Sequence, residues 1–432
     1  MSLEITGLIL FGVFFVLIFL NVPIAVSLGL SALVGLRVAD FDFSMYPSIM
    51  YTAIGKFALL AIPFFILAGV IMEYAGISQR LVNFASVCVG HLKGGMITVV
   101  VVVACFFAAI SGSGPATVAA LGSILIPAMV SGGYDRGVST ALMSASGAIG
   151  IIIPPSIAFV VYASIADVSV GALFAGGIIP GIIVGLAYIF AALWASRNNP
   201  DIVKQKPKPY KERLLAFKDA FWGLMTPVII LGGIYGGIFT PTEAAGVAVV
   251  YGLFVGLVIY REIKIRALWK LFVDAAVSSG TVMFIIAGAS VFAWLLTTSH
   301  IASTISQSVL SAGLNKITVL LIINLVFLVA GCFLDANSAF YIMVPIMMPI
   351  VAAFNIDPVH FGVFITVNMA IGLITPPVGI NLYVGCNISG VSVAELCRKI
   401  IPFVVAGIIA LAIITYIPEI TMYLPDKWAS KP

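Results

Sequence analysis

The stretch SASGAIGIIIPPS, residues 144–156, interrupts what its flanks would otherwise make one membrane-spanning helix from Gly137 to Ile165. Pro154 and Pro155 have no amide hydrogen to donate, and helical geometry is disfavoured for the residue before each proline. The stretch therefore predicts a discontinuous helix over about residues 137–165. A proline kink without a functional role is the simpler alternative for a single break of this kind.

The second half of the chain repeats this pattern in GLITPPVG, residues 372–379, which predicts a second broken helix. Many residues in the first half have the same residue type 222 positions later, as Asp135 and Asp357 do. Such self-similarity predicts two repeats, over residues 1–195 and 221–432. The loop before the first hairpin is basic and its counterpart is not, which indicates inverted topology. The second broken helix is expected over about residues 357–387.

The composition requires lipid around most of the chain. Hydrophobic residues make up 62% and charged residues 9%, against about a quarter charged in soluble domains. Many apolar runs approach the ~20 residues that a spanning helix needs, so we predict an all-α polytopic membrane protein. The N-terminus lacks the basic segment of a secretory signal, and its first apolar run is expected to be a retained span. The five cysteines show no spacing typical of zinc or a disulfide framework.

Charged loops predict the orientation. Residues 196–220 carry seven Lys or Arg against three acidic residues, which indicates a cytoplasmic linker. The loops at 80–93 and 261–270 are also basic and are expected on the same side. Residues 39–44 contain two aspartates without a base, and residues 300–315 contain no Lys, Arg or acid, which suits the opposite side. The net charge of +4 therefore reports orientation, and no nucleic-acid partner is expected.

Two re-entrant hairpins are expected before the broken helices, at about residues 96–130 and 317–352. The apolar arms of the first hairpin have only about 13 to 15 residues, too few to cross alone. Its tip, SGSGP at residues 111–115, cannot be regular helix. The second tip, residues 331–338, contains Asp335, whose burial would need a cation or hydrogen bonds. A helix cap on the amides of Asn337 or Ser338 is the alternative, and both roles can hold together.

A break in a membrane helix leaves backbone carbonyl oxygens and amides without helical partners. At membrane depth these groups must be buried in protein or line a water-filled cavity. Oxygens at the tips and breaks suit a small cation, and free amides at helix ends suit an anion. A packing turn of small residues is the simpler alternative for the first tip. The residues expected to bind cations are Ser111, Gly112, Ser113, Gly114, Ser144, Ser146, Gly147, Gly150, Pro154, Gly331, Asp335, Asn337, Thr366, Asn368, Gly372 and Thr375. The residues expected to bind the substrate are Pro115, Thr117, Pro155, Ser156, Ser338, Pro376, Pro377, Gly379 and Asn381.

Three polar residues receive structural expectations. Glu243, in GIFTPTEAAG, is expected to cap a helix after Pro241. Glu73 and Glu395 lie near the ends of spans and are expected to face lipid headgroups.

Six strings carry a resemblance to a known family: SGSGPATVAA, GIIIPPS, GGIYGGIFTPTEAAGVAVVYG, NIDPVHFG, GLITPPVGINLYV and ITYIPEITMYLP. From about Leu8 to Pro425 the chain resembles the large membrane subunit, of the DctM or SiaM type, of the tripartite ATP-independent periplasmic transporters. The resemblance implies two or more sodium ions, bound between each tip and its break, that drive import of a carboxylate such as sialic acid or a C4-dicarboxylate.

The resemblance also implies partners and a mechanism. These are a periplasmic substrate-binding protein, a separate small four-helix membrane subunit, membrane lipid, and location in the bacterial inner membrane. A transport domain that bears the hairpins would move against a fixed scaffold, elevator fashion. The alternative is a free-standing sodium/dicarboxylate symporter of related fold. A channel is disfavoured because no filter-like string or ring of charge is present, and a hydrolase because no nucleophile has a base nearby in sequence. We therefore expect no enzyme activity.

Overall fold

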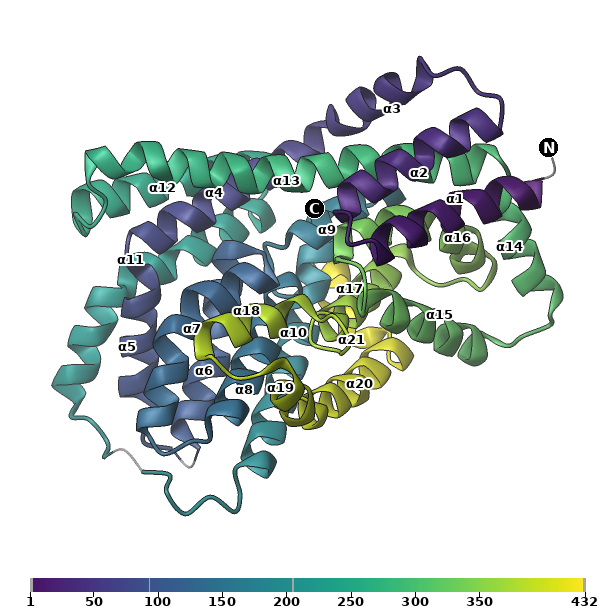
Figure 1. Cartoon of the computed structure of the whole chain (residues 1–432). Coiled ribbons are helices and arrows are strands. Elements are labelled where there is room, and N and C mark those ends of the chain that lie inside the picture. Colours follow the sequence, from purple (N-terminus) through teal and green to yellow (C-terminus); the bar gives the residue numbers. More distant parts are fainter. Residues whose placement is uncertain (1–2, 93, 204–205, 430–432) are drawn as a thin grey trace.

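The computed structural model describes residues 3–92, 94–203 and 206–429, whose regular structure is all helical (Figure 1). Lys93, Lys204 and Gln205, which belong to two of the basic loops, lie outside the described residues. The first-half helices are α1 (Leu3–Phe19), α2 (Ile24–Val38), α3 (Met45–Ile54), the 3-10 helix η1 (Phe57–Leu60), α4 (Ala61–Tyr74), α5 (Ile77–Val89), α6 (Gly95–Ser111), α7 (Gly114–Ser131), α8 (Arg136–Ala148), the 3-10 helix η2 (Ile149–Ile151), α9 (Ile157–Ala166) and α10 (Val170–Ala195).

The second-half helices are α11 (Tyr210–Tyr235), α12 (Pro241–Phe254), the π-helix η3 (Val255–Ile259), α13 (Ile265–Thr298), α14 (Ile301–Ser311), α15 (Lys316–Gly331), α16 (Ala336–Ala353), α17 (Pro358–Gly372), α18 (Ile380–Ser389), α19 (Val393–Lys399), α20 (Ile401–Tyr416) and α21 (Glu419–Ala429). Among the described residues, seven helices are long and apolar enough to cross a membrane, or up to nine if each bent pair is one span. The prediction of an all-helical, multi-span membrane protein is confirmed.

A long straight helix, α13, runs along one side of the molecule (Figure 1). Its 34 residues correspond to about 50 Å at 1.5 Å per residue. It packs against α2, α3 and α4, and also against α16. The helices with glycine and proline breaks, α6 to α9 and α15 to α18, lie to one side of it.

Each half of the chain contains two helices joined at a tip, followed by a helix with a break. The first tip joins α6 and α7 through Gly112, whose φ of 61° lies in the left-handed region that glycine adopts without strain. The second tip joins α15 and α16. The breaks after α8 and α17 contain the cis peptide bonds Pro154-Pro155 and Pro376-Pro377.

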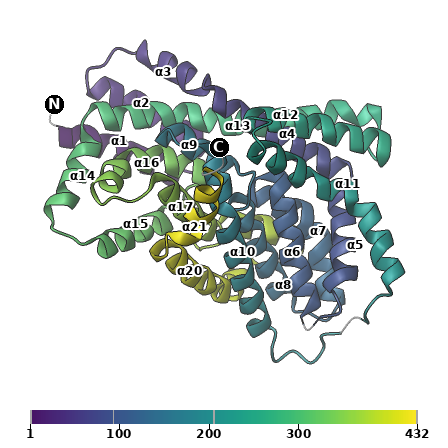
Figure 2. The same cartoon turned by 180° about the vertical axis from the view of Figure 1, so that it is seen from behind.

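The two halves exchange the ends of their broken helices. The first-half helix α9 packs on α16 of the second half, and α18 packs on α7 and α8 of the first half (Figures 1 and 2). Matching caps accompany this exchange. The Asp135 carboxylate accepts from the Val138 amide at the start of α8, and Asp357 begins α17 in the same way.

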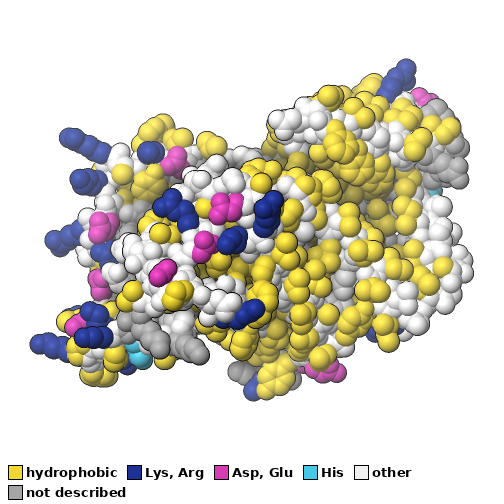
Figure 3. All heavy atoms as spheres, turned by 60° about the horizontal axis from the view of Figure 1, so that its bottom comes forward, with side chains coloured by type: hydrophobic (Ala, Val, Ile, Leu, Met, Phe, Trp, Pro, Cys, Tyr) yellow, Lys and Arg dark blue, Asp and Glu magenta, His cyan; other side chains and the backbone are white. Residues whose placement is uncertain are grey.

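The basic loops lie on one side of the molecule. Lys and Arg side chains gather toward one end of the face in Figure 3, and hydrophobic side chains dominate the other end. Arg80 lies 3.3 Å from the Asp219 carboxylate and 3.1 Å from that of Glu262. These three residues come from three different basic segments, so those segments meet on one side.

Candidate functional site

The first hairpin tip rests against the first break. A Cβ placed on Gly150 would lie 2.8 Å from the Ser113 carbonyl oxygen, so glycine is required for this approach. The Thr117 hydroxyl donates to that same carbonyl at 2.8 Å, and the Ser111 and Thr117 hydroxyl oxygens are 2.9 Å apart. The structure therefore brings Ser111, Ser113, Thr117 and Gly150 together.

The remaining tip residues contact the start of α9 and the end of α8. The Ile157 amide, the first in α9, donates to the Gly112 carbonyl at 3.4 Å. The Ser156 hydroxyl donates to the carbonyl five residues earlier and accepts from the Phe159 amide, so it caps α9. A Cβ placed on Gly147 would lie 3.2 Å from the Gly114 carbonyl oxygen. The other residues of this group, Pro115, Pro154 and Pro155, lie at the start of α7 and in the break.

The second tip approaches its own break through two glycines. A Cβ placed on Gly372, at the end of α17, would lie 2.6 Å from the Cα of Gly331, at the end of α15. The Asp335 carboxylate accepts from the Asn337 amide at 3.0 Å and the Ser338 amide at 3.4 Å, and from the Ser338 hydroxyl. The helix cap given as the alternative role of Asp335 is present, and it leaves the cation-binding prediction open.

The polar residues of α17 and of the break after it are held by hydrogen bonds within the chain segment itself or to α15. Thr366 and Thr375 each donate to a carbonyl one turn earlier, both at 2.7 Å. The Asn368 amide group donates to the Asn324 carbonyl at 2.9 Å and to its side-chain oxygen at 3.0 Å. The sequence analysis missed Asn324, although a lone buried asparagine in the apolar run of α15 is a signal for such a role.

Asn381 connects the two halves. Its side-chain amide donates to the Ser144 carbonyl at 3.0 Å, and the Ser144 hydroxyl donates to the Asn381 carbonyl at 3.2 Å. A Cβ placed on Gly114 would lie 3.3 Å from both side-chain polar atoms of Asn381. The Ser144 side chain therefore bonds to α18 rather than to the first tip. Asn381, which we expected to bind the substrate, lies beside Ser144 and Gly114, which we expected to bind a cation. Pro376, Pro377 and Gly379 form the loop that leads into α18.

Four buried oxygens at the tips and breaks have no hydrogen-bond partner among the described residues. They are Ser146 Oγ, Asn337 Oδ1, Asn368 Oδ1 and Asn381 Oδ1. An unsatisfied buried acceptor costs about 1–3 kcal/mol, and all four residues belong to the sets expected to bind cation or substrate. Hydroxyl and amide oxygens are the ligands that hard cations prefer, so these residues fit a bound cation.

Four helices also begin at the tips and breaks: α7 at Gly114, α9 at Ile157, α16 at Ala336 and α18 at Ile380. The first amides of a helix carry partial positive charge and bind anions. The site therefore combines oxygens for cations with positive helix ends for an anion.

The carboxylate of Glu73 borders this site. A cavity of about 170 Å³ is lined by Glu73 of α4, Ser278 of α13, and Ser111 and Ser113 of the first tip. Glu73 was expected to face headgroups; its side chain is exposed in the last turn of α4 and also borders the first tip. Its neighbour Tyr74 donates to the Asp274 carboxylate at 2.8 Å.

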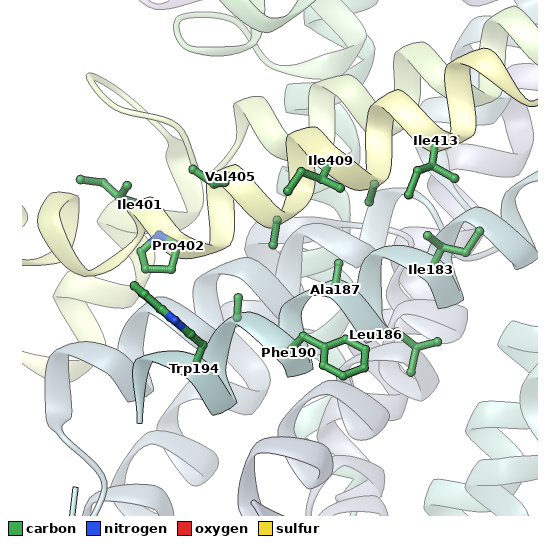
Figure 4. Close-up of a pocket in the computed structure, with 13 residues that line it drawn as sticks. Ile183, Leu186, Ala187, Phe190, Trp194, Ile401, Pro402, Val405, Ile409 and Ile413 are labelled. Atoms are coloured by element: carbon green, nitrogen blue, oxygen red, sulfur yellow. The ribbon is translucent and has the colours of Figure 1, made fainter. Parts of the chain in front are cut away.

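A larger groove, of about 670 Å³, lies between α10 and α20 (Figure 4). Phe190 and Trp194 of α10 face Val405 and Ile409 of α20, and these four side chains are exposed. With only apolar side chains lining it, this groove has no chemistry for an ion or an anion.

Fold and site together define a multi-span membrane protein with broken helices, of the kind that moves ions and solutes. The family model described as "Tripartite ATP-independent periplasmic transporter, DctM component" matches residues 11–420, and the chain belongs to this family. It is a transporter permease of the bacterial inner membrane, not an enzyme. The resemblance found in the sequence is confirmed.

Two curated relatives and one solved structure illustrate the similarity. The chain is 43% identical to the isethionate TRAP transporter permease protein DctMQ of Oleidesulfovibrio alaskensis, over 96% of the chain and 66% of that protein. It is 42% identical to the C4-dicarboxylate TRAP transporter large permease protein DctM of Vibrio cholerae, over 94% of each. Its fold is similar to that of the Alcanivorax borkumensis YdaH transporter, with a TM-score of 0.63, 13% identity, and coverage of 92% and 90%.

Proposed function

We propose that this chain is the large membrane subunit of a sodium-coupled importer of an organic carboxylate. The observation that carries the proposal is the group of four partnerless oxygens at the tips and breaks. Two sodium ions, one at each tip, would supply partners for Ser146, Asn337 and Asn368, and the substrate would supply one for Asn381. Asp335 then has two roles, because its carboxylate caps α16 and supplies negative charge close to the second ion.

The substrate anion binds between the two ions, at the positive ends of α7 and α18. Asn381, in the first turn of α18, offers its second amide hydrogen to a carboxylate and its side-chain oxygen to a hydroxyl donor. A C4-dicarboxylate and sialic acid both fit this chemistry. Relatives named for isethionate, a sulfonate, and for C4-dicarboxylates are 43% and 42% identical to this chain, and two named for sialic acid are 33% and 34% identical, which favours a small organic acid.

The transport step is an elevator movement of a unit built from the hairpins and broken helices. Support comes from the exchange of α9 and α18, which joins the two halves into one packed unit. The other helices, with α13 as the longest, form the scaffold. The repeats run in opposite directions through the membrane, as the difference in charge of their loops indicates.

Two protein partners complete the transporter: a small four-helix membrane subunit and a periplasmic substrate-binding protein. The DctMQ relative is longer than this chain, and the difference in length leaves room for a fused small subunit there. The exposed apolar groove between α10 and α20 suits lipid acyl chains.

Uptake into proteoliposomes tests the coupling. The chain is reconstituted with the small subunit and the binding protein, and labelled succinate, isethionate and sialic acid are supplied with an inward sodium or potassium gradient. We expect uptake of succinate or sialic acid, only with sodium and only with the binding protein, and uptake of isethionate alone would reject a carboxylate as the substrate. Uptake in potassium rejects sodium coupling, and uptake by the chain alone supports the free-standing symporter.

A further inference from the structure

A second hollow, lined by both polar and apolar side chains, lies on the opposite side of the molecule from the basic loops. It is a groove of about 610 Å³ between α3, α9, α13 and α16. Ser48, Thr52 and Lys56 line it from the α3 side, Thr297 and Thr298 from α13, and Tyr341 from α16. The uncharged loop at 300–315 follows α13 and the acidic loop at 39–44 precedes α3, so the groove lies on the side predicted to be periplasmic.

Lys56 gives the groove a positive charge. Among the described residues that line it, Lys56 alone is charged, and it forms no ion pair with a described carboxylate. Its ammonium group donates to the Ser164 carbonyl at 2.6 Å, which leaves two N–H groups for another acceptor. The cavity at the first tip is instead lined by an acidic side chain, that of Glu73.

The inner wall of the groove is formed by two helices that begin at the tips and breaks, α9 and α16. Tyr341 lies five residues into α16 from Ala336, about 8 Å along the axis at 1.5 Å per residue. The groove meets α9 at Ile165, near the end of that helix away from the break. The outer wall is formed by α3 and α13, which we assign to the scaffold.

We propose that this groove is the vestibule through which the anionic substrate enters from the periplasmic side, with Lys56 as its charge-selecting group. This inference rests on the proposed import of a carboxylate. The positive charge concentrates anions over cations at the mouth of the groove before the substrate reaches the tips. The hydroxyl groups of Ser48, Thr52 and Thr298 line the same groove as Lys56.

Charged thiol reagents measure this potential directly. Thr297→Cys places a thiol on the α13 wall, and intact cells are treated with membrane-impermeant methanethiosulfonates that carry a sulfonate or a trimethylammonium group. The parent chain gives the background. A single charge on the far wall of a water-filled groove changes the reaction rate of a charged reagent by about threefold to tenfold. We expect Lys56→Gln to lower the anionic-to-cationic rate ratio by at least about threefold, and Lys56→Arg to preserve it.

Two controls test whether the effect of Lys56 is confined to the groove. Ser311→Cys, on exposed α14 at the same side, should show no change with Lys56→Gln. Lys316→Gln removes a lysine that also donates to a backbone carbonyl, at 3.0 Å to Asn355, and should not change labelling at Thr297→Cys.

An unchanged ratio in Lys56→Gln overturns the proposal, as does a thiol at Thr297→Cys that does not react from outside. An equal change at Ser311→Cys also overturns it, because the effect would not belong to the groove. Labelling needs neither sodium nor transport, so this result is independent of the uptake assay that tests the proposed function.

Discussion

Replacing Gly372 by alanine tests the closest backbone approach in the candidate site. The added Cβ would lie 2.6 Å from the Gly331 Cα and 2.7 Å from its carbonyl carbon. Carbon atoms pack at about 3.5–4.0 Å, so the second tip must move from α17 by about 1 Å. Overpacking of this kind costs about 1–3 kcal/mol. If the whole cost falls on the sodium-bound state, sodium binds about 5-fold to 150-fold more weakly.

The assay is the sodium concentration that gives half-maximal uptake, together with the rise in thermal unfolding temperature on adding NaCl. Gly246→Ala is the matched control, because nothing lies within 4 Å of its added Cβ in α12. It should leave both quantities unchanged. Gly331→Ala provides a milder step, since its Cβ would lie 3.0 Å from the Gly372 Cα. Should Gly372→Ala match the control in both quantities, the second tip and break do not form a sodium site.

Three further substitutions separate ion binding from stability. Asp335→Asn keeps a good helix cap but removes the charge. We therefore expect a melting temperature near that of the wild type and a loss of sodium-dependent uptake. A large drop in the melting temperature would contradict this. Ser146→Ala removes an unpartnered buried hydroxyl, so the sodium-free protein should be stabilised by about 1 kcal/mol, while the NaCl-induced rise in melting temperature shrinks. Asn368→Leu deletes two donated hydrogen bonds and leaves the Asn324 oxygen unpaired, and should destabilise the protein by about 2–4 kcal/mol in urea unfolding.

Local chemistry made much of the architecture predictable. Pro154 and Pro155 have no amide hydrogen wherever they occur, so a break in the helix follows from their identity. The same holds for caps. Glu243 was expected to cap a helix, and its side chain accepts from the Thr240 amide at 2.8 Å in a reciprocal capping box. Predictions of this kind succeed because donor and acceptor lie within a few residues of each other.

Contacts between segments far apart in the chain could not be predicted from the sequence in the same way. Nothing near Ser144 in the sequence indicates that its hydroxyl bonds to Asn381, 237 residues later. The pairing of Asn324 with Asn368 likewise depends on how α15 packs on α17. Glu73 lies near a helix end, as the sequence indicated, but the approach of Ser111 and Ser113 to it could not be read from the sequence.

The shared position of Asn381 suggests how the ions and the substrate depend on each other. Its amide group is fixed by the Ser144 carbonyl in α8, and its free oxygen lies at the start of α18, in the other half of the chain. A cation at the first tip would order Gly114 and Ser144, and through them the side chain that we assign to the substrate. Binding of ion and substrate would then be cooperative, and by thermodynamic reciprocity the substrate would raise sodium affinity by the same factor. Asn381→Ala should therefore reduce both affinities, because it removes the group that the two sites share.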